Sequence, residues 1–181
     1  MVGEILSTGD EICQGVVIDS NSAHIANLLD EIGIEVTRHT CVGDDMDQLA
    51  TILSEIGARA DIAVITGGLG PTVDDLSAAA AAEAAGVDLE VNQEAFRSME
   101  AYFAKFSRKV TGSDNKQALL PSGALPIINT CGTAPGFIFN IGRCRCYFLP
   151  GVPKEMEKML SLSVIPDILA NRGDKKSFTL R

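Results

Sequence analysis

The sequence predicts an α/β fold: a three-layer sandwich with a mainly parallel sheet and one antiparallel hairpin strand. Strand and helix patterns alternate along the first half of the chain. A short run at residues 62–65 is wholly apolar, which is typical of a parallel strand that helices bury on both faces. The length of 181 residues fits one compact domain, at roughly 150 residues per domain.

The chain begins with a strand, a helix and a second strand. Residues 4–7 form the first strand, and a polar loop leads to a helix. In this helix apolar residues recur at spacings of three and four from Ile25 to Ile32, just before Gly33. Residues 34–42 form the second strand. This order is the beginning of a βαβ arrangement.

Two more helices flank the central strand at 62–65. The pair Asp44–Asp45 starts the first of them, whose apolar face runs over residues 49–60. A glycine-rich turn at 67–70 follows the central strand, and an alanine-rich helix spans residues 77–85. We expect the small side chains of this helix to let it lie close to the sheet.

The chain then leaves the sheet with a helix that begins near Asn92. This helix presents Phe96, Met99, Phe103 and Phe106 at helical spacing, which indicates a core face or a subunit contact. The polar segment 111–117 follows it.

The last part of the chain returns to the sheet. Residues 127–128 form a short strand, and 137–141 with 144–149 form a hairpin, so that one strand runs antiparallel. A final helix begins at Pro153, and Pro166 ends or kinks it. We assign residues 1–170 to one domain and take 171–181 as a polar tail or the start of a cut segment, with strand-like residues at 178–180.

Composition excludes several classes of protein. Apolar residues make up 46% and charged residues 22%, which fits a folded globular protein. The net charge of −9, from 15 Lys and Arg against 24 Asp and Glu, repels nucleic acid and anionic membranes. There is neither an apolar run long enough for a membrane span nor a signal-like beginning, so we expect a cytoplasmic protein. Five cysteines, an odd number, indicate free thiols.

Ligands of open parallel sheets bind beyond the carboxyl ends of the strands. The loops at these ends hold hydroxyl, amide, glycine and acidic residues, and we expect them to converge on one edge. The predicted ligand-binding residues are Thr8, Asp10, Glu11, Ser20, Asn21, Thr66, Gly67, Gly68, Gly70, Thr72 and Gly151.

The glycine turn at 67–70 resembles a phosphate cradle. Glycine permits positive φ and has no Cβ, so backbone N–H groups can approach an oxyanion. The turn matches neither the Walker sequence nor the dinucleotide fingerprint, and a purely structural turn is the alternative. Thr72 adds a hydroxyl that can donate to phosphate.

The acidic residues of these loops favour a divalent metal ion, of Mg, Mn, Co or Ni. Six acids lie in the loops with Lys154 as the one nearby cation, so an anionic ligand would be repelled without a metal. We predict Asp44, Asp74 and Asp75 as metal ligands, and Asp44, Asp75 and Lys154 as catalytic residues. For Asp45 and Asp74 a helix cap is an equal alternative.

Other candidates are weaker. His24 and His39 are expected in ordinary surface or packing roles, and Cys144 and Cys146 as buried thiols without the rest of a zinc site.

Seven ordered motifs together resemble one known family. They are Ser7–Glu11, Asp19–Ser22, Val42–Asp45, Thr66–Asp75, Asn115–Ala118, Gly132–Gly136 and Leu149–Met156. The chain resembles the amino-terminal domain of the competence/damage-inducible CinA family, a branch of the MoaB/Mog molybdopterin-binding superfamily. The resemblance runs from about residue 4 to 170, and the motifs at 69–75 and 149–156 distinguish the CinA branch most clearly.

The resemblance implies the three-layer fold and a site at the carboxyl edge of the sheet. It also implies activities that differ between branches: Mog-like members handle molybdopterin and its adenylylated form, and CinA-type domains are associated with metal-dependent hydrolysis of ADP-ribose. The chain departs from the Mog pattern at Leu69, where Mog-like members have Thr, and at Asp74, where they commonly have Arg. Full-length CinA proteins usually add an amidohydrolase domain with no counterpart here, so deamidation is not expected of this chain.

Three hypotheses follow. The first is a metal-dependent pyrophosphatase that acts on ADP-ribose or a related dinucleotide. The second is a molybdopterin-binding protein of molybdenum cofactor biosynthesis, and the third is a noncatalytic nucleotide-binding or oligomerisation module. The family resemblance also implies a homo-oligomer, a dimer or a trimer.

Overall fold

The computed structural model describes residues 1–172. The strand-like residues 178–180 and most of the expected tail lie outside the described residues.

The described chain alternates strands and helices as follows: β1 Val2–Thr8, α1 Asp10–Cys13, α2 Ser20–Glu31, β2 Glu35–Val42, α3 Met46–Arg59, β3 Ile62–Thr66, α4 Ser77–Ala85, β4 Leu89–Val91, α5 Gln93–Ala104, the 3₁₀ helix η1 Asp114–Ala118, β5 Leu119–Pro121, β6 Leu125–Ile127, β7 Gly136–Ile141, β8 Cys144–Leu149, α6 Pro153–Met159, the π-helix η2 Leu160–Val164 and α7 Ile165–Asn171.

Six strands form the main sheet in the order β2-β1-β3-β8-β7-β6. The pairs β1–β2, β1–β3 and β3–β8 are parallel, whereas β7 runs antiparallel to both β8 and β6. All five residues of β3 are buried, as expected for a parallel strand between two helical layers. The predicted α/β class, the central strand and the hairpin are confirmed.

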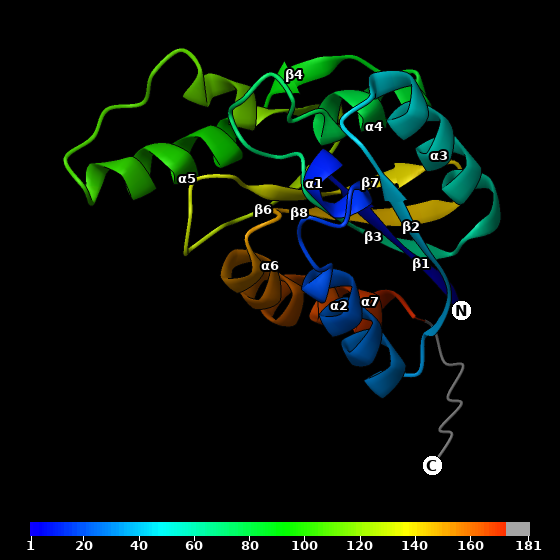
Figure 1. Ribbon diagram of the computed structural model, residues 1–181. Helices are drawn as coiled ribbons and strands as arrows, with labels where there is room; N and C mark the ends of the chain where they lie inside the picture. Colours follow the sequence, from blue (N-terminus) through cyan, green and yellow to red (C-terminus); the bar gives the residue numbers. More distant parts are fainter. Residues whose placement is uncertain (173–181) are drawn as a thin grey trace.

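Helices cover both faces of the sheet (Figure 1). Helices α2, α6 and α7 lie on one face, where Ile25, Leu29 and Met156 belong to one hydrophobic cluster. Helices α3 and α4 lie on the other face, where Leu53 and Ala80 belong to a second cluster. The two clusters are the two interfaces of a three-layer sandwich.

The alanine-rich helix α4 is close-packed, as the sequence predicts. Ala80 and Ala81 are fully buried in the cluster that also contains α3 residues. Gly86 ends the helix with a φ of 68°, in the left-handed region that favours glycine.

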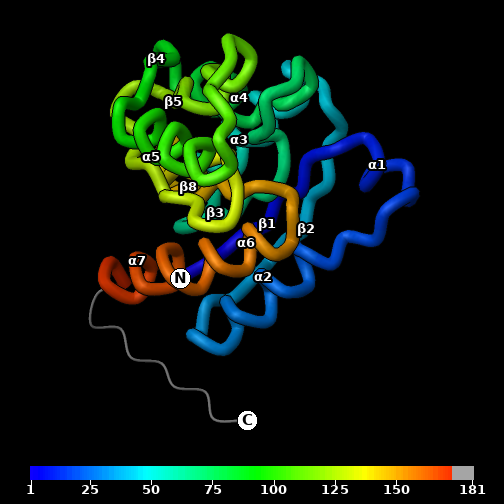
Figure 2. Tube along the Cα trace, turned by 90° about the vertical axis from the view of Figure 1, so that its left-hand side faces the viewer, coloured from blue at the N-terminus to red at the C-terminus, as the bar shows by residue number. Residues whose placement is uncertain are grey.

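Some local structure differs from the sequence prediction. The expected polar loop after β1 contains the short helix α1, which has no buried residue. The segment outside the sheet holds a second sheet, β4–β5, which strand patterns of three residues were too short to reveal. In Figure 2, α1 lies at one side of the molecule and β4, β5 and α5 lie together at another.

The segment 92–110 is only partly helical. Asn92 caps α5 by accepting a hydrogen bond from the amide of Ala95 (3.0 Å), as a helix start requires. Met99 and Phe103 are buried, but the helix ends at Ala104 and Phe106 is 67% exposed. The aromatic pattern thus extends past the helix end.

The carboxyl-terminal helix is continuous through a change of pitch. Five residues, Leu160–Val164, adopt a π-helix immediately before Pro166 in the first turn of α7. Proline has no N–H and clashes with the preceding turn, and a wider turn accommodates it. The predicted helix end at Pro166 is not observed, because the chain stays helical from the π-helix through α7. None of the helices within residues 1–172 is long and apolar enough to cross a lipid bilayer.

Candidate functional site

The carboxyl ends of β1, β2, β3 and β8 meet at one edge of the sheet, because these four strands are parallel to one another. The amide of Gly9 donates to the carbonyl of Val42 (3.1 Å), which joins the loops after β1 and β2. The amide of Gly67 donates to the carbonyl of Leu149 (3.0 Å), which joins those after β3 and β8. The structure therefore brings the predicted loops together.

The glycine turn after β3 needs its first two glycines. Gly67 has a φ of 107° and Gly68 a φ of 66°, both in the region that L side chains rarely adopt. A Cβ on Gly67 would also lie 2.6 Å from the Thr8 carbonyl oxygen. Ser77 holds the turn by donating its hydroxyl to the carbonyl of Gly67 (2.8 Å).

The amide groups of this turn are not equivalent. The N–H of Gly67 donates to the carbonyl of Leu149. The expectation that this N–H contributes to a phosphate cradle is therefore corrected. Within residues 1–172 no acceptor pairs with the N–H groups of Gly68, Leu69 and Gly70. These three amides are the donors that remain for a ligand.

Buried polar atoms without partners lie beside the glycine turn. Thr8 is 6% exposed, and its hydroxyl oxygen has no hydrogen-bond partner within residues 1–172. The side-chain oxygen of Asn21, in the first turn of α2, is also buried and unpartnered. Buried polar groups are nearly always paired, so these two atoms are candidate contacts for a ligand.

The rest of this network is satisfied. The amide nitrogen of Asn21 donates to the Thr66 hydroxyl (3.1 Å) and to the carbonyl of Gly151 (2.9 Å). The Thr66 hydroxyl in turn donates to the carbonyl of Pro150 (3.2 Å). Thr66 and Gly151 thus hold Asn21 in place. Ser20 is exposed in the first turn of α2.

Asp10 and Asp44 hold the loops after β1 and β2 against each other. The amide of Asp44 donates to Asp10 Oδ1 (3.1 Å), and the amide of Asp10 donates to Asp44 Oδ2 (3.3 Å). Burial raises the pKa of Asp44, the hydrogen bond from Asp10 opposes the rise, and the charges of Asp10, Glu11 and Asp74 add to it. A cation would relieve this repulsion.

The Asp75 carboxylate accepts hydrogen bonds within the turn that follows the glycines. Its Oδ2 accepts hydrogen bonds from the amide (2.8 Å) and the hydroxyl (2.6 Å) of Thr72. The Thr72 hydroxyl predicted to donate to phosphate therefore donates to Asp75. Asp74 is exposed, and α4 begins without a side-chain cap, so Asp74 is not a helix cap. Asp45 is one, because it accepts from the amide of Gln48 (2.9 Å).

The predicted metal ligands do not form a complete set by themselves. Within the part of the chain that the structure describes, no three His, Cys, Asp or Glu side chains gather closely enough to hold a metal ion. The carboxylate oxygens of Asp10 and Asp44 are nevertheless the donors that Mg²⁺ prefers. Mg²⁺ is usually bound by one or two carboxylates together with water and substrate phosphate.

Lys116 is a cation that lies beside the glycine turn and that the sequence analysis did not assign to the site. Lys116 Nζ donates to the carbonyl of Thr72 and lies 3.4 Å from that of Val73. Lys154 is exposed in the first turn of α6. The only sequence signal for Lys116 was its place in the motif 115–118, because 44 residues separate it from Thr72.

A small pocket of about 90 Å³ lies behind the turn, with Gly68, Leu69, Asp75, Lys116 and Gln117 among the residues that line it. Its walls are mostly apolar, and the Leu69 side chain is only 7% exposed. The side-chain oxygen of Gln117 is buried and has no hydrogen-bond partner among the described residues 1–172. The pocket therefore offers one buried acceptor.

Asn129 and Glu155 hold the loop at residues 131–134 in place. The sequence analysis did not predict this contact between the two side chains. The Asn129 side chain accepts from the amides of Cys131 and Gly132 (both 2.9 Å) and donates to Glu155 (2.5 Å). A Cβ on Gly132 would lie 2.2 Å from Glu155. These contacts bring the 132–136 and 149–156 motifs together in the structure.

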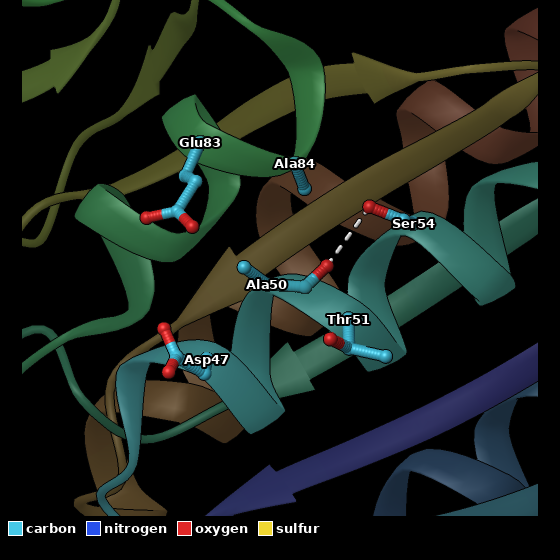
Figure 3. Close-up of a pocket in the computed structure, with 6 residues that line it drawn as sticks. All are labelled: Asp47, Ala50, Thr51, Ser54, Glu83 and Ala84. Carbon is cyan, nitrogen blue, oxygen red and sulfur yellow. Dashed lines mark hydrogen bonds between the residues drawn. The ribbon is translucent and has the colours of Figure 1, made fainter.

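A larger hollow of about 330 Å³ lies between α3 and α4 (Figure 3). Asp47 and Glu83 line it from the two helices, together with small side chains, and Ser54 donates to the carbonyl of Ala50 (2.9 Å). It contains none of the predicted site residues.

Comparison with known proteins gives consistent relationships. The family described as a probable molybdopterin binding domain matches residues 4–170. A CinA-like protein of Desulfosudis oleivorans is 51% identical over 173 residues, which are 96% of this chain and 42% of the relative. A CinA-like protein of Citrifermentans bemidjiense is 47% identical over 91% of this chain and 40% of its own length. The chain thus spans about two fifths of these curated relatives.

Solved structures agree with the sequence relatives. The crystal structure of the protein CinA of unknown function from Thermoplasma acidophilum has a TM-score of 0.86 and 34% identity, covering 93% of this chain and 99% of the other. The molybdopterin biosynthesis enzyme MoaB from Thermus thermophilus has a TM-score of 0.62 at 19% identity, covering 94% and 92%. This second likeness concerns the fold alone.

Proposed function

The chain belongs to the probable molybdopterin-binding domain family, in its CinA-like branch, and from this we propose that it binds a phosphate-bearing small molecule at the carboxyl edge of its sheet. The observation that carries the proposal is the pair of buried, unpartnered oxygens of Thr8 and Asn21 beside the glycine turn. An unpaired buried polar group costs about 1–3 kcal/mol, and a ligand removes that cost.

The donors and acceptors suit a phosphorylated sugar. The Thr8 hydroxyl and the amides of Gly68 and Gly70 can donate to phosphate oxygens. The Asn21 side-chain oxygen can accept from a sugar hydroxyl. The pocket at Gln117 is smaller than the 300–1,000 Å³ or so of a whole ligand site, so we assign it one heterocyclic ring whose amino group donates to Gln117.

We assign the charge balance of the site to a divalent ion held by Asp44 together with Asp10 or Asp74 and by the phosphate of the ligand. When bound, the ion supplies positive charge that offsets phosphate and polarises the phosphoryl group. Lys116, by contrast, orients the glycine turn through the Thr72 carbonyl. Asp75 keeps the Thr72 turn in shape.

The reaction that we propose is hydrolysis of ADP-ribose. Water adds to one phosphorus, the bond from that phosphorus to the bridging oxygen breaks, and the products are AMP and ribose 5-phosphate. Molybdopterin binding is the second candidate, which membership of the probable molybdopterin-binding family and the fold shared with the molybdopterin biosynthesis enzyme MoaB favour. Leu69, which replaces the Thr of Mog-like members, lines the small pocket that we assign to the heterocycle, so this departure from the Mog pattern stays an argument against the second candidate.

The test is a turnover screen of ADP-ribose with Mg²⁺, Mn²⁺, Co²⁺ or Ni²⁺, with release of AMP as the readout. We expect turnover with at least one metal and none in excess chelator. Binding of ADP-ribose without AMP release would favour the noncatalytic module. Binding of molybdopterin but not of ADP-ribose would favour the cofactor-biosynthesis function.

Self-association and a cytoplasmic location, both expected from the sequence, stay predictions. Exposed apolar residues Val16, Val17 and Ile18 lie in the loop after α1, and we propose that a second copy of the chain contacts them.

A further inference from the structure

Two exposed cysteines from distant parts of the sequence face each other at the edge of the sheet. Cys13 is the last residue of α1 and Cys41 lies near the end of β2. Their sulfur atoms are 3.0 Å apart, and both residues are exposed. By contrast, Cys144 and Cys146 are buried and Cys131 is half-buried. Only the first pair combines close approach with access to solution.

The two sulfur atoms already lie close enough for a small movement to form a disulfide bond. An S–S bond measures about 2.04 Å, so the sulfurs need to approach by only about 1 Å. Helix α1 has four residues, none of them buried, and Gly15 follows it with a φ of 72°. A shift of that size therefore disturbs no core packing.

We propose that Cys13 and Cys41 are a modification site, a dithiol that a low-molecular-weight disulfide such as oxidised glutathione converts into an intramolecular disulfide. One cysteine thiolate attacks the glutathione disulfide, forms a mixed disulfide and releases one reduced glutathione. The second cysteine then attacks the mixed disulfide and releases the other glutathione. Two cysteine thiols are oxidised and one glutathione disulfide is reduced. The two protons of the cysteine thiols end on the two glutathione thiolates that are released.

The disulfide would connect the two loops that carry the acidic pair. Asp10 belongs to the same short helix as Cys13, and Asp44 follows the strand of Cys41. Oxidation therefore ties α1 to β2 and restricts the relative movement of Asp10 and Asp44. This inference is independent of the proposed function, because it requires neither a ligand nor turnover.

The local charges affect the rate of this oxidation. The hydrogen bond between the Cys13 and Cys41 sulfur atoms raises the pKa of Cys13 to about 11, and burial and the charges of Cys41, Asp10 and Asp44 add to the rise. Because the thiolate is the reacting form, the reaction is slow near neutral pH. The experiment therefore measures the end point after a long incubation.

The full chain is incubated with excess oxidised glutathione, blocked with an alkylating reagent, cleaved with trypsin without reduction and analysed by mass spectrometry. Cleavage after Arg38 and Arg59 places Cys13 in peptide 1–38 and Cys41 in peptide 39–59. We expect these two peptides to be joined and lighter than their sum by two hydrogen atoms. The oxidised chain should also melt at least about 3 °C higher, since the bond closes a long loop.

Matched variants separate the pair from the other cysteines. Cys131→Ser should form the same joined peptides. Cys13→Ser and Cys41→Ser should each stop at one mixed disulfide with glutathione on the remaining thiol. Stable mixed disulfides on both cysteines of the unaltered chain, a bond between two copies, or two unmodified peptides would each overturn the proposal.

Discussion

Two buried threonine hydroxyls at neighbouring strand ends differ in their partners. The Thr66 hydroxyl donates to Pro150 and accepts from Asn21, so it stabilises the free protein. The Thr8 hydroxyl has no partner within residues 1–172, so it costs stability until a ligand binds. Removing a structural hydroxyl should lower the free energy of unfolding, whereas removing a ligand-binding hydroxyl should lower the affinity for the ligand. These two measurements distinguish the two roles.

Replacing Thr8 with Val tests that distinction. We expect Thr8→Val to keep or raise the free energy of unfolding, because no hydrogen bond of the protein is lost. Affinity for ADP-ribose should fall about tenfold, which corresponds to about 1.4 kcal/mol for one hydrogen bond. Urea unfolding and isothermal titration measure the two quantities.

Thr66→Val is the matched control at the neighbouring strand end. It should lose about 1–2 kcal/mol of unfolding free energy, because Pro150 and Asn21 lose their partner. If Thr8→Val destabilises the chain as much as this control and binds ADP-ribose normally, the Thr8 hydroxyl is structural.

Replacing Asp75 with Asn tests its charge. Asn retains a carbonyl oxygen that can accept from the amide and hydroxyl of Thr72, so the turn and the melting temperature should hardly change. Metal-dependent turnover of ADP-ribose should fall by about tenfold or more, because the substitution removes a negative charge next to Asp74, one of the proposed metal ligands.

Asp45→Asn is the control for Asp75→Asn, since Asp45 caps α3 and Asn is as good a cap as Asp. It should leave both stability and turnover nearly unchanged. Equal turnover in Asp75→Asn and Asp45→Asn would remove Asp75 from the catalytic residues and leave it as a turn residue only.

At the scale of elements, the Asp167 carboxylate of α7 makes hydrogen bonds to two side chains of β8. Arg145 on β8 donates to Asp167 through Nε (2.7 Å) and a terminal nitrogen (3.0 Å), and the Tyr147 hydroxyl donates to it as well (2.8 Å). The Arg145 hydrogen bond lowers the pKa of Asp167, burial opposes this, and the Tyr147 hydroxyl lowers it further. A lowered pKa in the folded state means that ionised Asp167 stabilises the fold.

We therefore expect a pH-dependent effect of Asp167→Asn. The stabilisation is fully present above the unfolded pKa of about 3.9 and is lost as pH falls through the lower folded value. At pH 7 the variant should lose about 1–3 kcal/mol of unfolding free energy. Urea unfolding at pH 7 and pH 3 should show this difference narrowing at pH 3.

The exposed Asp30 of α2 provides the control for that series, because its side chain makes no hydrogen bond within residues 1–172. Asp30→Asn should match the unaltered chain within about 0.5 kcal/mol. A loss in Asp167→Asn that stays the same at both pH values would mean that packing, not ionisation, explains it.

At the scale of the whole molecule, self-association is the open expectation. The sequence argument relied on the aromatic residues of 92–110, but Met99 and Phe103 pack into a small cluster with Ala118. The exposed apolar side chains include Phe106 and the run Val16, Val17 and Ile18, and the three residues of this run are 74%, 47% and 89% exposed. Exposed apolar patches of this kind often mark interfaces.

Sedimentation at micromolar concentration should show a dimer or trimer of the 19.1 kDa chain. We expect Ile18→Asp to shift the chain toward the monomer, because association would bury the new charge without a partner. Phe106→Ser should leave the association unchanged. A 19.1 kDa species alone in the unaltered chain contradicts the prediction. If Phe106→Ser and not Ile18→Asp shifts the chain toward the monomer, the interface lies at the segment that follows α5.

The sequence by itself determined the alternation of elements, the buried central strand, the hairpin and the convergence of loops at one edge. These features depend on periodicity and on glycine or proline signals a few residues apart, so they are visible locally. The positions of the acidic residues in the loops could be predicted for the same reason. The groups to which these residues make hydrogen bonds could not be predicted.

Only the tertiary structure decided which side chains meet. Lys116 reaches the glycine turn across 44 residues and Asn129 meets Glu155 across 26. It also showed that the Gly67 amide is occupied, that Leu69 is in the core, and that Cys13 faces Cys41. Such contacts follow from how strands are ordered and how loops pack over them, and no local pattern encodes that order. The same packing leaves the Thr8 hydroxyl buried without a partner, a property that composition and spacing cannot reveal.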